Sequence, residues 1–195
     1  GPAMRDLAEI SVEDLFKEGD IAVADMLDLR TQTFRRSARR KELEKFMHAW
    51  PATSSGAPKL SSDEDKVRFG TAMWILGRVR EGAEVLSSVK EHAAGAYFWA
   101  RTQIELNRPN DAAEALRPLA TRNKKSEPVR LSYVEALMAL GQSDTLSEAV
   151  AAVVADFPES ADALAFKGML QDLEGDHEGA LDLLKQLLLV LGEWH

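Results

Sequence analysis

The sequence predicts an all-α protein built from stacked antiparallel helix pairs. The first observation is a turn residue, Gly or Asn, which recurs after spacings of 30, 34 and 34 residues at Gly77, Asn107, Gly141 and Gly175. Self-similarity at such a period is typical of repeat architectures. The second observation is that each turn separates two segments with apolar residues at helical spacing. The third is that Gly and Asn tolerate the left-handed conformation with which many helices end.

Small residues accompany each turn, as close packing of two helices requires. Seven residues before the turns stand Gly70, Ala100, Val134 and Gly168. Beyond the turns stand Gly82, Ala112, Ala149 and Ala180, followed four residues later by Leu86, Leu116, Val153 and Leu184. Because residues four apart share a helix face, we expect these apolar residues on the same face of the second helix of each pair.

The pattern predicts four helix pairs and marks their ends. The pairs are 63–76 with 80–91, 93–106 with 110–121, 127–140 with 145–156, and 161–174 with 178–191. Pro128 falls in the first turn of its helix, where a missing N–H costs nothing, and Pro158 follows a helix end. Pro118 falls inside a predicted helix and is expected to kink it or end it early.

On these residues, the region 63–191 resembles the tetratricopeptide repeat family. The last unit, ADALAFKGMLQDLEGDHEGALDLLKQLL, has Gly168, Gly175, Asp176, Ala180 and Leu181 where the family pattern places them. The unit from Glu127 matches least, since Val134 replaces a small residue and extra residues lie around 143–145. The resemblance implies an α-solenoid, a right-handed superhelix of antiparallel helix pairs with a concave side that binds a protein or peptide.

The N-terminal part is expected to be a helical extension of this array. Residues 1–3 are interpreted as a tag scar, and residues 4–50 as a helical segment that is either a degenerate repeat or a cap. Within it, the apolar pattern predicts a helix from Asp20 to Ala49. The Pro, Gly and Ser residues of 51–62 predict a flexible linker. Residues 192–195 are interpreted as a terminal tail, at which the chain is expected to be truncated.

Composition narrows the function further. The chain has 195 residues, is 45% hydrophobic and carries a net charge of -8, so it is a poor overall match for nucleic acid or anionic membranes. It contains no cysteine, which excludes disulfides and thiolate chemistry. No run reaches the roughly 18 apolar residues of a membrane helix. With acidic residues soon after Met4, we expect a cytoplasmic protein.

Catalytic and metal-binding patterns are missing from the sequence. The four histidines, His48, His92, His177 and His195, form no metal-binding pair at helical spacing. Asp176, His177 and Glu178 are interpreted as the acidic first turn of a helix rather than as a metal fragment. There is no phosphate-binding glycine loop, zinc spacing or nucleophile elbow. We therefore expect no enzyme activity, no cofactor and no metal.

The resemblance also implies which residues line the concave groove, on the first helix of each pair. Carried over by alignment, they are Val67, Thr71, Trp74, Tyr97, Arg101, Ile104, Leu131, Glu135, Met138, Ala165, Met169 and Asp172. This lining suits an apolar or amphipathic segment, with Arg101, Glu135 and Asp172 setting its orientation. Chaperone-binding members of the family hold a C-terminal carboxylate with Lys and Asn side chains. Val67 and Thr71 stand at matching positions here, which argues against such a carboxylate clamp. The alternative for Trp74 and Tyr97 is packing between neighbouring helices.

A basic run between Arg30 and Lys41 holds six cations. Its candidate contact residues for nucleic acid or an acidic membrane are Arg35, Arg36, Arg39 and Arg40. No aromatic residue other than Phe34 is interleaved with them, and no DNA-binding motif is present. The favoured interpretation is therefore a solvated helix face, or a face that docks on the acidic repeats.

The last helix is apolar nearly all round, whereas a terminal repeat normally has a polar outer face. One predicted stripe comprises Leu181, Leu184, Leu188 and Leu191, and a second comprises Leu183, Leu187, Val190 and Trp194. Either a following repeat is missing from the chain, or this face is an interface with a partner or a second copy. Leu181, Leu184, Leu188, Leu191 and Trp194 are the candidate interface residues.

The predicted function is protein–protein interaction, as a scaffold or adaptor that holds a partner segment in the groove. The alternative is a self-assembling structural protein, joined through the leucine-rich C-terminal helix and the N-terminal helix. A further hypothesis is autoinhibition, with residues 4–50 lying in the groove. A nucleic-acid partner ranks below these three.

Overall fold

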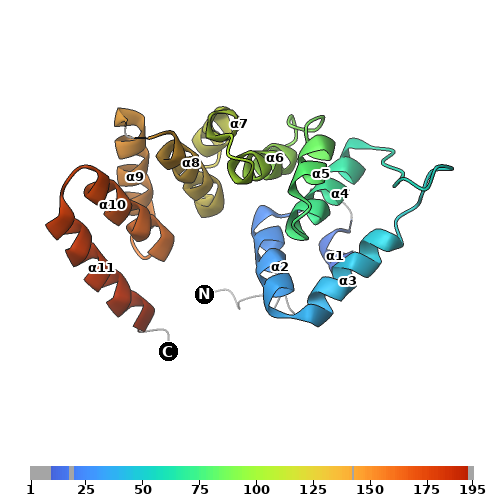
Figure 1. Ribbon diagram of the computed structural model, residues 1–195, viewed down its shortest axis with the longest axis horizontal. Helices are drawn as coiled ribbons and strands as arrows, with labels where there is room; N and C mark the ends of the chain where they lie inside the picture. Colours follow the sequence, from blue (N-terminus) through green and yellow to red (C-terminus); the bar gives the residue numbers. More distant parts are fainter. Residues whose placement is uncertain (1–9, 18–19, 142, 193–195) are drawn as a thin grey trace. The chain divides into compact units, whose positions relative to one another are not determined.

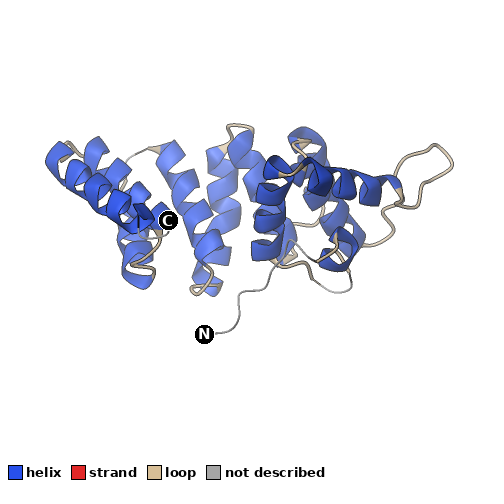
Figure 2. Ribbon diagram, turned by 90° about the horizontal axis from the view of Figure 1, so that it is seen from below, coloured by secondary structure: helices blue, strands red, loops and turns tan. Residues whose placement is uncertain are grey.

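A computed structural model describes residues 10–17, 20–141 and 143–192 of the chain, with the side chain of residue 190 excluded. In this part of the chain the regular elements are all helices, numbered α1 to α11, and no strand occurs (Figure 2). The prediction of an all-α protein made of helix pairs is therefore confirmed. The structure divides into two compact units between Asn107 and Arg108.

The first unit contains the N-terminal helices and the first predicted pair. Its helices are α1 (Val12–Leu15), α2 (Val23–Arg35), α3 (Ser37–His48), α4 (Asp63–Ile75), α5 (Val79–Leu86) and α6 (Ala93–Glu105). Helices α4 and α5 pack together as the predicted pair, and α6 packs against both (Figure 1). The core of this unit includes Met26, Leu29, Leu43, Trp74 and Phe98, all with no exposed surface.

The second unit contains the remaining helices. They are α7 (Pro109–Arg122), α8 (Glu127–Leu140), α9 (Asp144–Asp156), α10 (Ala161–Leu173) and α11 (His177–Gly192). The predicted pairs α8 with α9 and α10 with α11 both form. The pairing predicted for 93–106 and 110–121 spans the division between the units and stays a prediction, as does the division of the chain into segments 1–3, 4–50, 51–62, 63–191 and 192–195.

Capping residues explain where several helices begin. Ser62, Ser126, Ser143 and Ser160 are the N-caps of α4, α8, α9 and α10, and each hydroxyl accepts a hydrogen bond from a backbone N–H in the first turn. Such caps satisfy donors that a helix start leaves unpaired. Proline occupies the first turn of α7 and α8, where it removes no helical hydrogen bond.

The four aligned turn residues adopt the conformation that their identity predicts. Backbone φ is 83° at Gly77, 60° at Asn107, 108° at Gly141 and 88° at Gly175. Close packing at the predicted small positions is confirmed in the first pair. A Cβ atom added to Gly82 would lie 3.0 Å from the carbonyl oxygen of Gly70, so the α4 and α5 backbones approach directly.

The long helix predicted from Asp20 to Ala49 is wrong. Arg36 adopts an extended conformation, with φ -134° and ψ 111°, and separates α2 from α3. Between Phe34 and Leu43 only Ala38 is apolar, so a straight helix would bury little there. The break instead lets α2 bury Met26 and Leu29 while α3 buries Leu43.

Two further predictions about helix ends are also wrong. The second helix of the first pair ends at Leu86 rather than near residue 91. Of the two effects expected at Pro118, the early helix end is wrong, because α7 continues to Arg122, and the kink stays a prediction. The proline is exposed, so its ring meets solvent, and the helix loses one backbone hydrogen bond without burying an unpaired group.

Residues 51–62, predicted to be a flexible linker, contain a hydrogen-bonded hairpin. Ala52 and Pro58 form an antiparallel β-bridge, and the N–H of Lys59 donates to the Pro51 carbonyl over 2.7 Å. The indole N–H of Trp50 donates to the Lys59 carbonyl over 3.0 Å. Trp50 also makes an edge contact with Phe69 of α4. These contacts attach the segment to α3 and α4.

Candidate partner-binding surfaces

Four of the groove positions of the first unit are filled by the protein itself. Val67, Thr71, Trp74 and Tyr97 are all buried. The Trp74 ring packs against Phe98 of α6 at a centroid distance of 5.2 Å, and Tyr97 makes an edge contact with Phe98 at 4.9 Å. Trp74 and Tyr97 thus pack between neighbouring helices, the alternative considered from the sequence.

Helix α2 supplies part of the cover over Trp74. The Arg30 guanidinium lies over the indole ring, 4.1 Å from its centroid, and its Nη2 atom pairs with Glu105 Oε1 at 2.8 Å. The indole N–H of Trp74 donates to the other oxygen of Glu105 over 3.2 Å. Three helices, α2, α4 and α6, therefore meet at one polar cluster, and a ligand could reach Trp74 only if this cluster opened.

The remaining groove residues differ in exposure from these four. Arg101, Ile104, Leu131, Glu135, Met138 and Ala165 are half-buried, whereas Met169 and Asp172 are exposed. Asp172 forms a hydrogen-bonded pair with His177 in the first turn of α11. In the second unit, accessible groove residues therefore lie on α10, the first helix of the last pair.

Register positions make the contrast between the two units direct. Met169 stands one residue after Gly168, as Thr71 stands one residue after Gly70. Thr71 has no exposed surface, whereas the Met169 side chain is 51% exposed. Leu173, one helical turn beyond Met169, is 55% exposed. Sequence analysis missed Leu173, although its spacing of four residues from Met169 could have indicated it.

A second apolar surface lies on α11. We call Leu181, Leu184, Leu188 and Leu191 the leucine stripe; their exposed fractions lie between 46% and 62%. Leu189, also missed by sequence analysis, is 71% exposed on another side of the helix. Trp194, the fifth predicted interface residue, lies outside the described residues, as does His195.

The inward side of α11 corrects the alignment of this helix. The alignment placed Leu184 on the same helix face as Leu86, whose side chain packs against Gly70. In the last pair it is Leu183 that approaches Gly168, with 3.6 Å between its Cδ2 atom and a Cβ added to the glycine. Leu183 is buried and Leu184 is exposed. Within its own pair, α11 therefore turns a different side toward α10 than the alignment indicated, and the leucine stripe faces solvent.

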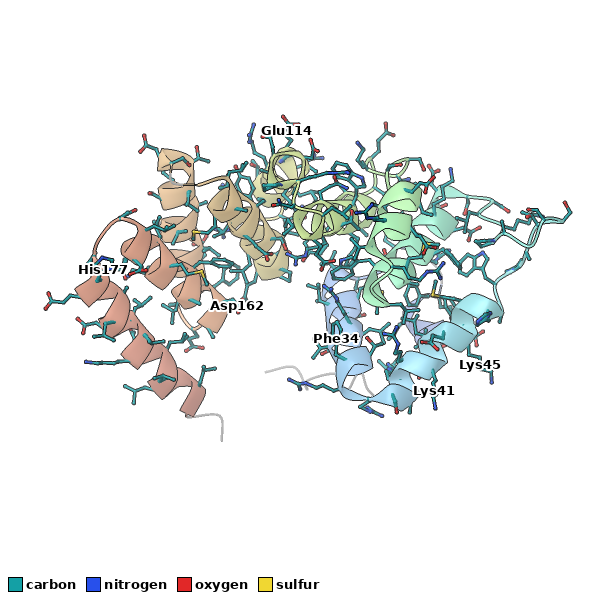
Figure 3. The ribbon with its side chains drawn as sticks, viewed as in Figure 1. Phe34, Lys41, Lys45, Glu114, Asp162 and His177 are labelled. Atoms are coloured by element: carbon teal, nitrogen blue, oxygen red, sulfur yellow. The ribbon has the colours of Figure 1, made fainter. Side chains whose placement is uncertain are left out.

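The basic residues Arg35, Arg36, Arg39 and Arg40 do not form one exposed patch. Arg39 is buried, where its Nε donates to Gln32 over 2.7 Å and its Nη1 to Glu42 over 2.8 Å. Arg40 pairs with Glu44 and donates to the Leu76 carbonyl at the end of α4. Arg35 and Arg36 are exposed, as are Lys41 and Lys45, which extend from α3 (Figure 3). Half of the predicted contact set thus serves internal packing.

Glu42 has a shifted pKa. Burial acts to raise the pKa of its carboxyl group, but the hydrogen bond from the Val12 N–H and the bond and charge of Arg39 outweigh it, so the pKa is lowered. The Val12 N–H lies 2.9 Å from Glu42 Oε1. The carboxylate thereby joins α1 to α3 and compensates the buried Arg39. Glu42 and Val12 also line a cavity of about 440 Å³, together with Phe46 and Trp50.

Among the described residues, no group of three or more His, Asp or Glu side chains could hold a metal ion. In the same part of the chain, no helix is both long and apolar enough to cross a membrane.

The helix-pair architecture is that of tetratricopeptide-repeat proteins, and comparison with solved structures shows the same fold. A MamA protein from Desulfovibrio magneticus RS-1 matches with a TM-score of 0.67 and 17% identity, over 88% of this chain and 98% of that one. TTC0263, a thermophilic tetratricopeptide-repeat protein of Thermus thermophilus, matches with a TM-score of 0.55 and 21% identity, over 66% of this chain and 74% of that one.

A third similar structure is YrrB, a tetratricopeptide-repeat protein described as having an unusual peptide-binding site. It matches with a TM-score of 0.61 and 16% identity, over 86% of this chain and 84% of that one. No family model matches the sequence, and no curated protein matches it either. At these identities the similarity shows the fold, and the function has to be argued from the surfaces.

Proposed function

We propose that the protein is a non-catalytic interaction scaffold that holds an apolar or amphipathic segment of a partner protein against the first helices of its second unit. The observation that carries the proposal is the exposure of Met169 and Leu173 on α10. Leu131, Met138 and Ala165 extend the same groove lining along α8 and α10, with Glu135 and Asp172 as its charged members.

The partner segment is expected to bind by burying these apolar side chains. Met169 and Leu173 lie one helical turn apart and form an exposed apolar patch, the arrangement with which a groove binds an amphipathic helix. Methionine adapts its shape to different partners because its side chain is unbranched and flexible. The first unit is unsuited to the same role, since its Thr71 and Trp74 are already covered.

A second candidate function is self-association, favoured by the exposed leucine stripe. The N-terminal helix, which was expected to join copies together with the stripe, has its apolar residues Met26 and Leu29 buried within its own unit. If the protein self-associates, we therefore expect the contact between copies to be made by α11 alone.

The proposal is tested by affinity capture from native-source lysate with three forms of the protein. These are wild type, a Met169→Ser/Leu173→Ser variant, and a Leu140→Ser control at an exposed leucine that ends α8. A partner retained by wild type and control but lost from the double variant is then titrated as a purified protein. We expect its binding to show a negative heat-capacity change, the mark of apolar burial.

Captured proteins that do not depend on Met169 and Leu173 would contradict the proposed site. Light scattering of the same three samples separates the second candidate. A molar mass that rises with concentration, equally in all three, would favour self-association through another surface.

A further inference from the structure

The leucine stripe of α11 lacks the cover that residues at the same count from the helix start have in α5 and α7. Counted from the helix start, the fifth and eighth residues of α5 and α7 are Ala83, Leu86, Ala113 and Leu116, all of them buried. The same positions in α11 are Leu181 and Leu184, each 51% exposed. Leucines thus stand uncovered at positions that α5 and α7 enclose, whereas the same positions of α9 hold the exposed residues Glu148 and Ala151.

In the earlier pairs, a following first helix packs on the second helix of the pair. Helix α6 packs on α5, α8 packs on α7, and α10 packs on α9. In the described part of the chain, no helix packs in this way on α11. An α-helix is therefore the element whose shape fits beside the stripe, in the position of a following first helix. Leu188 and Leu191 continue the stripe at heptad spacing, which suits contact along a helix of similar length.

The charge around the stripe indicates the chemistry of that helix. Residues 161–192 contain six carboxylates and two lysines. Five of the carboxylates are exposed at the end of α10, in the turn after it and on α11: Asp172, Glu174, Asp176, Glu178 and Asp182. Asp162 and His177, labelled in Figure 3, mark the first turns of the two helices. A basic helix would be attracted to this surface, and an acidic one repelled.

A cavity at the Leu191 end of the stripe is also lined by acidic residues. Its volume is 590 Å³, and its lining includes Leu191 together with Glu127, Asp156 and Glu159. Asp156 is already paired with Arg130. Glu127 and Glu159 add two further carboxylates to the lining beside Leu191, so a lysine or arginine placed after the apolar face of a bound helix could enter here.

We propose that the leucine stripe binds a basic amphipathic α-helix of a partner protein, which lies where a following first helix of the repeat would lie. The inference takes from the proposed function only that the partner is a protein, because the stripe is a different surface from the α10 groove. A second copy of the chain is disfavoured as the occupant. Residues 108–195 contain fifteen acidic and eight basic residues, so two such surfaces repel each other.

The test uses three synthetic peptides of equal length, followed by fluorescence anisotropy. One is an amphipathic helix of leucine and lysine, the second replaces lysine with glutamate, and the third scrambles the first so that its apolar face is lost. We expect the leucine–lysine helix to bind at least about tenfold more tightly than the other two, a difference of about 1.4 kcal/mol.

Two variants of the full chain connect this binding to the stripe. Leu184→Ser/Leu188→Ser removes apolar area without changing charge, and Leu189→Ser makes the same change at an exposed leucine outside the stripe. The affinity for the leucine–lysine helix should fall at least about tenfold in the double variant and stay unchanged in the control. Circular dichroism confirms that each variant keeps its helices.

Four outcomes would overturn the inference. Binding that survives the double variant would show charge attraction elsewhere, and equal binding of the glutamate peptide would remove the charge argument. A wild-type dimer that dissociates in the double variant would assign the stripe to a second copy. Loss of peptide binding in Met169→Ser/Leu173→Ser, with the stripe variant unaffected, would support the α10 groove and reject the stripe, so the two proposals fail separately.

Discussion

Arg30 of α2 lies over the indole ring of Trp74 of α4, with 4.1 Å between the guanidinium carbon and the ring centroid. Both residues also contact Glu105 at the end of α6. The N-terminal segment is thus integrated with the first repeat helices through a cation, an aromatic ring and a carboxylate. A residue that belongs to the predicted basic run serves here as an internal contact.

Removing Arg30 should destabilise the first unit. The Arg30 and Glu105 side chains are each only 23% exposed, so Arg30→Ala leaves a poorly solvated carboxylate and uncovers the ring. We expect the free energy of unfolding to fall by about 1–3 kcal/mol, measured by urea denaturation. Arg35→Ala, at the exposed end of the same helix, should change it by less than about 0.5 kcal/mol. Equal effects of the two substitutions would contradict the role of the cluster.

The lowered pKa of Glu42 predicts a pH-dependent contribution to stability. A carboxyl group whose pKa is lower in the folded state stabilises the protein above its unfolded pKa, about 4.3. That contribution is lost as the pH falls through the folded pKa. Glu42→Gln should therefore be less stable than wild type at neutral pH, and the difference should shrink in acid.

Thermal denaturation of both forms at several pH values between neutral and acid measures this difference. The side chain of Glu42 is 41% exposed, so solvent screening keeps the effect small. A stability difference that stays constant across the pH range would show that Glu42 acts through packing alone.

Two glycine-to-alanine substitutions should change the free energy of unfolding in opposite directions. A Cβ atom at Gly95 in α6 would overlap the backbone carbonyl of Val89, which cannot move as a side chain can. At Gly168 in α10 it would lie 3.6 Å from Leu183, an ordinary contact. Alanine favours a helix over glycine. We expect Gly168→Ala to stabilise by about 0.5–1 kcal/mol and Gly95→Ala to destabilise by about 1–3 kcal/mol.

Chemical denaturation of the two variants provides the comparison. Because both are the same substitution inside a helix, helix propensity cancels between them and the surroundings decide the sign. Destabilisation of similar size at both positions would mean that the α10–α11 contact is tighter than the 3.6 Å distance indicates.

The turn conformations give a fourth prediction. Gly77 has φ 83°, and an added Cβ atom meets nothing within 4 Å, so Gly77→Ala tests the backbone alone. It should cost about 1–2 kcal/mol. Asn107, with φ 60°, already tolerates this region, so Asn107→Gly should change stability by less than about 0.5 kcal/mol. Thermal unfolding checks both, and a neutral Gly77→Ala would indicate that the turn relaxes.

Local features of the fold were predictable because they depend on short stretches of chain. The positive φ at Gly77 and Asn107 follows from their residue types and from their places at helix ends. Ser62 is likewise a residue type that favours the N-cap of a helix, and α4 begins directly after it. The break at Arg36 was not predictable from helical periodicity, since the residues around it favour a helix. It depends on where α2 and α3 find apolar surfaces to cover.

The candidate sites show the same division between local and long-range causes. Alignment placed Trp74 and Met169 on the same face of equivalent helices, but exposure depends on what lies opposite. Arg30, far away in sequence, covers Trp74, and nothing in the local pattern indicates it. The orientation of α11, which exposes Leu184 and buries Leu183, likewise depends on contact with α10.

The hairpin formed by residues 51–58 makes the chain convenient to label. Its tip is exposed, its backbone is held by the hydrogen bonds of Lys59 and Thr53, and a side-chain hydrogen bond joins Thr53 to Ser55 on either side of Ser54. The chain contains no cysteine, so Ser54→Cys would introduce a single thiol. A fluorophore attached there would report on partner binding from a position that belongs to neither the α10 groove nor the leucine stripe.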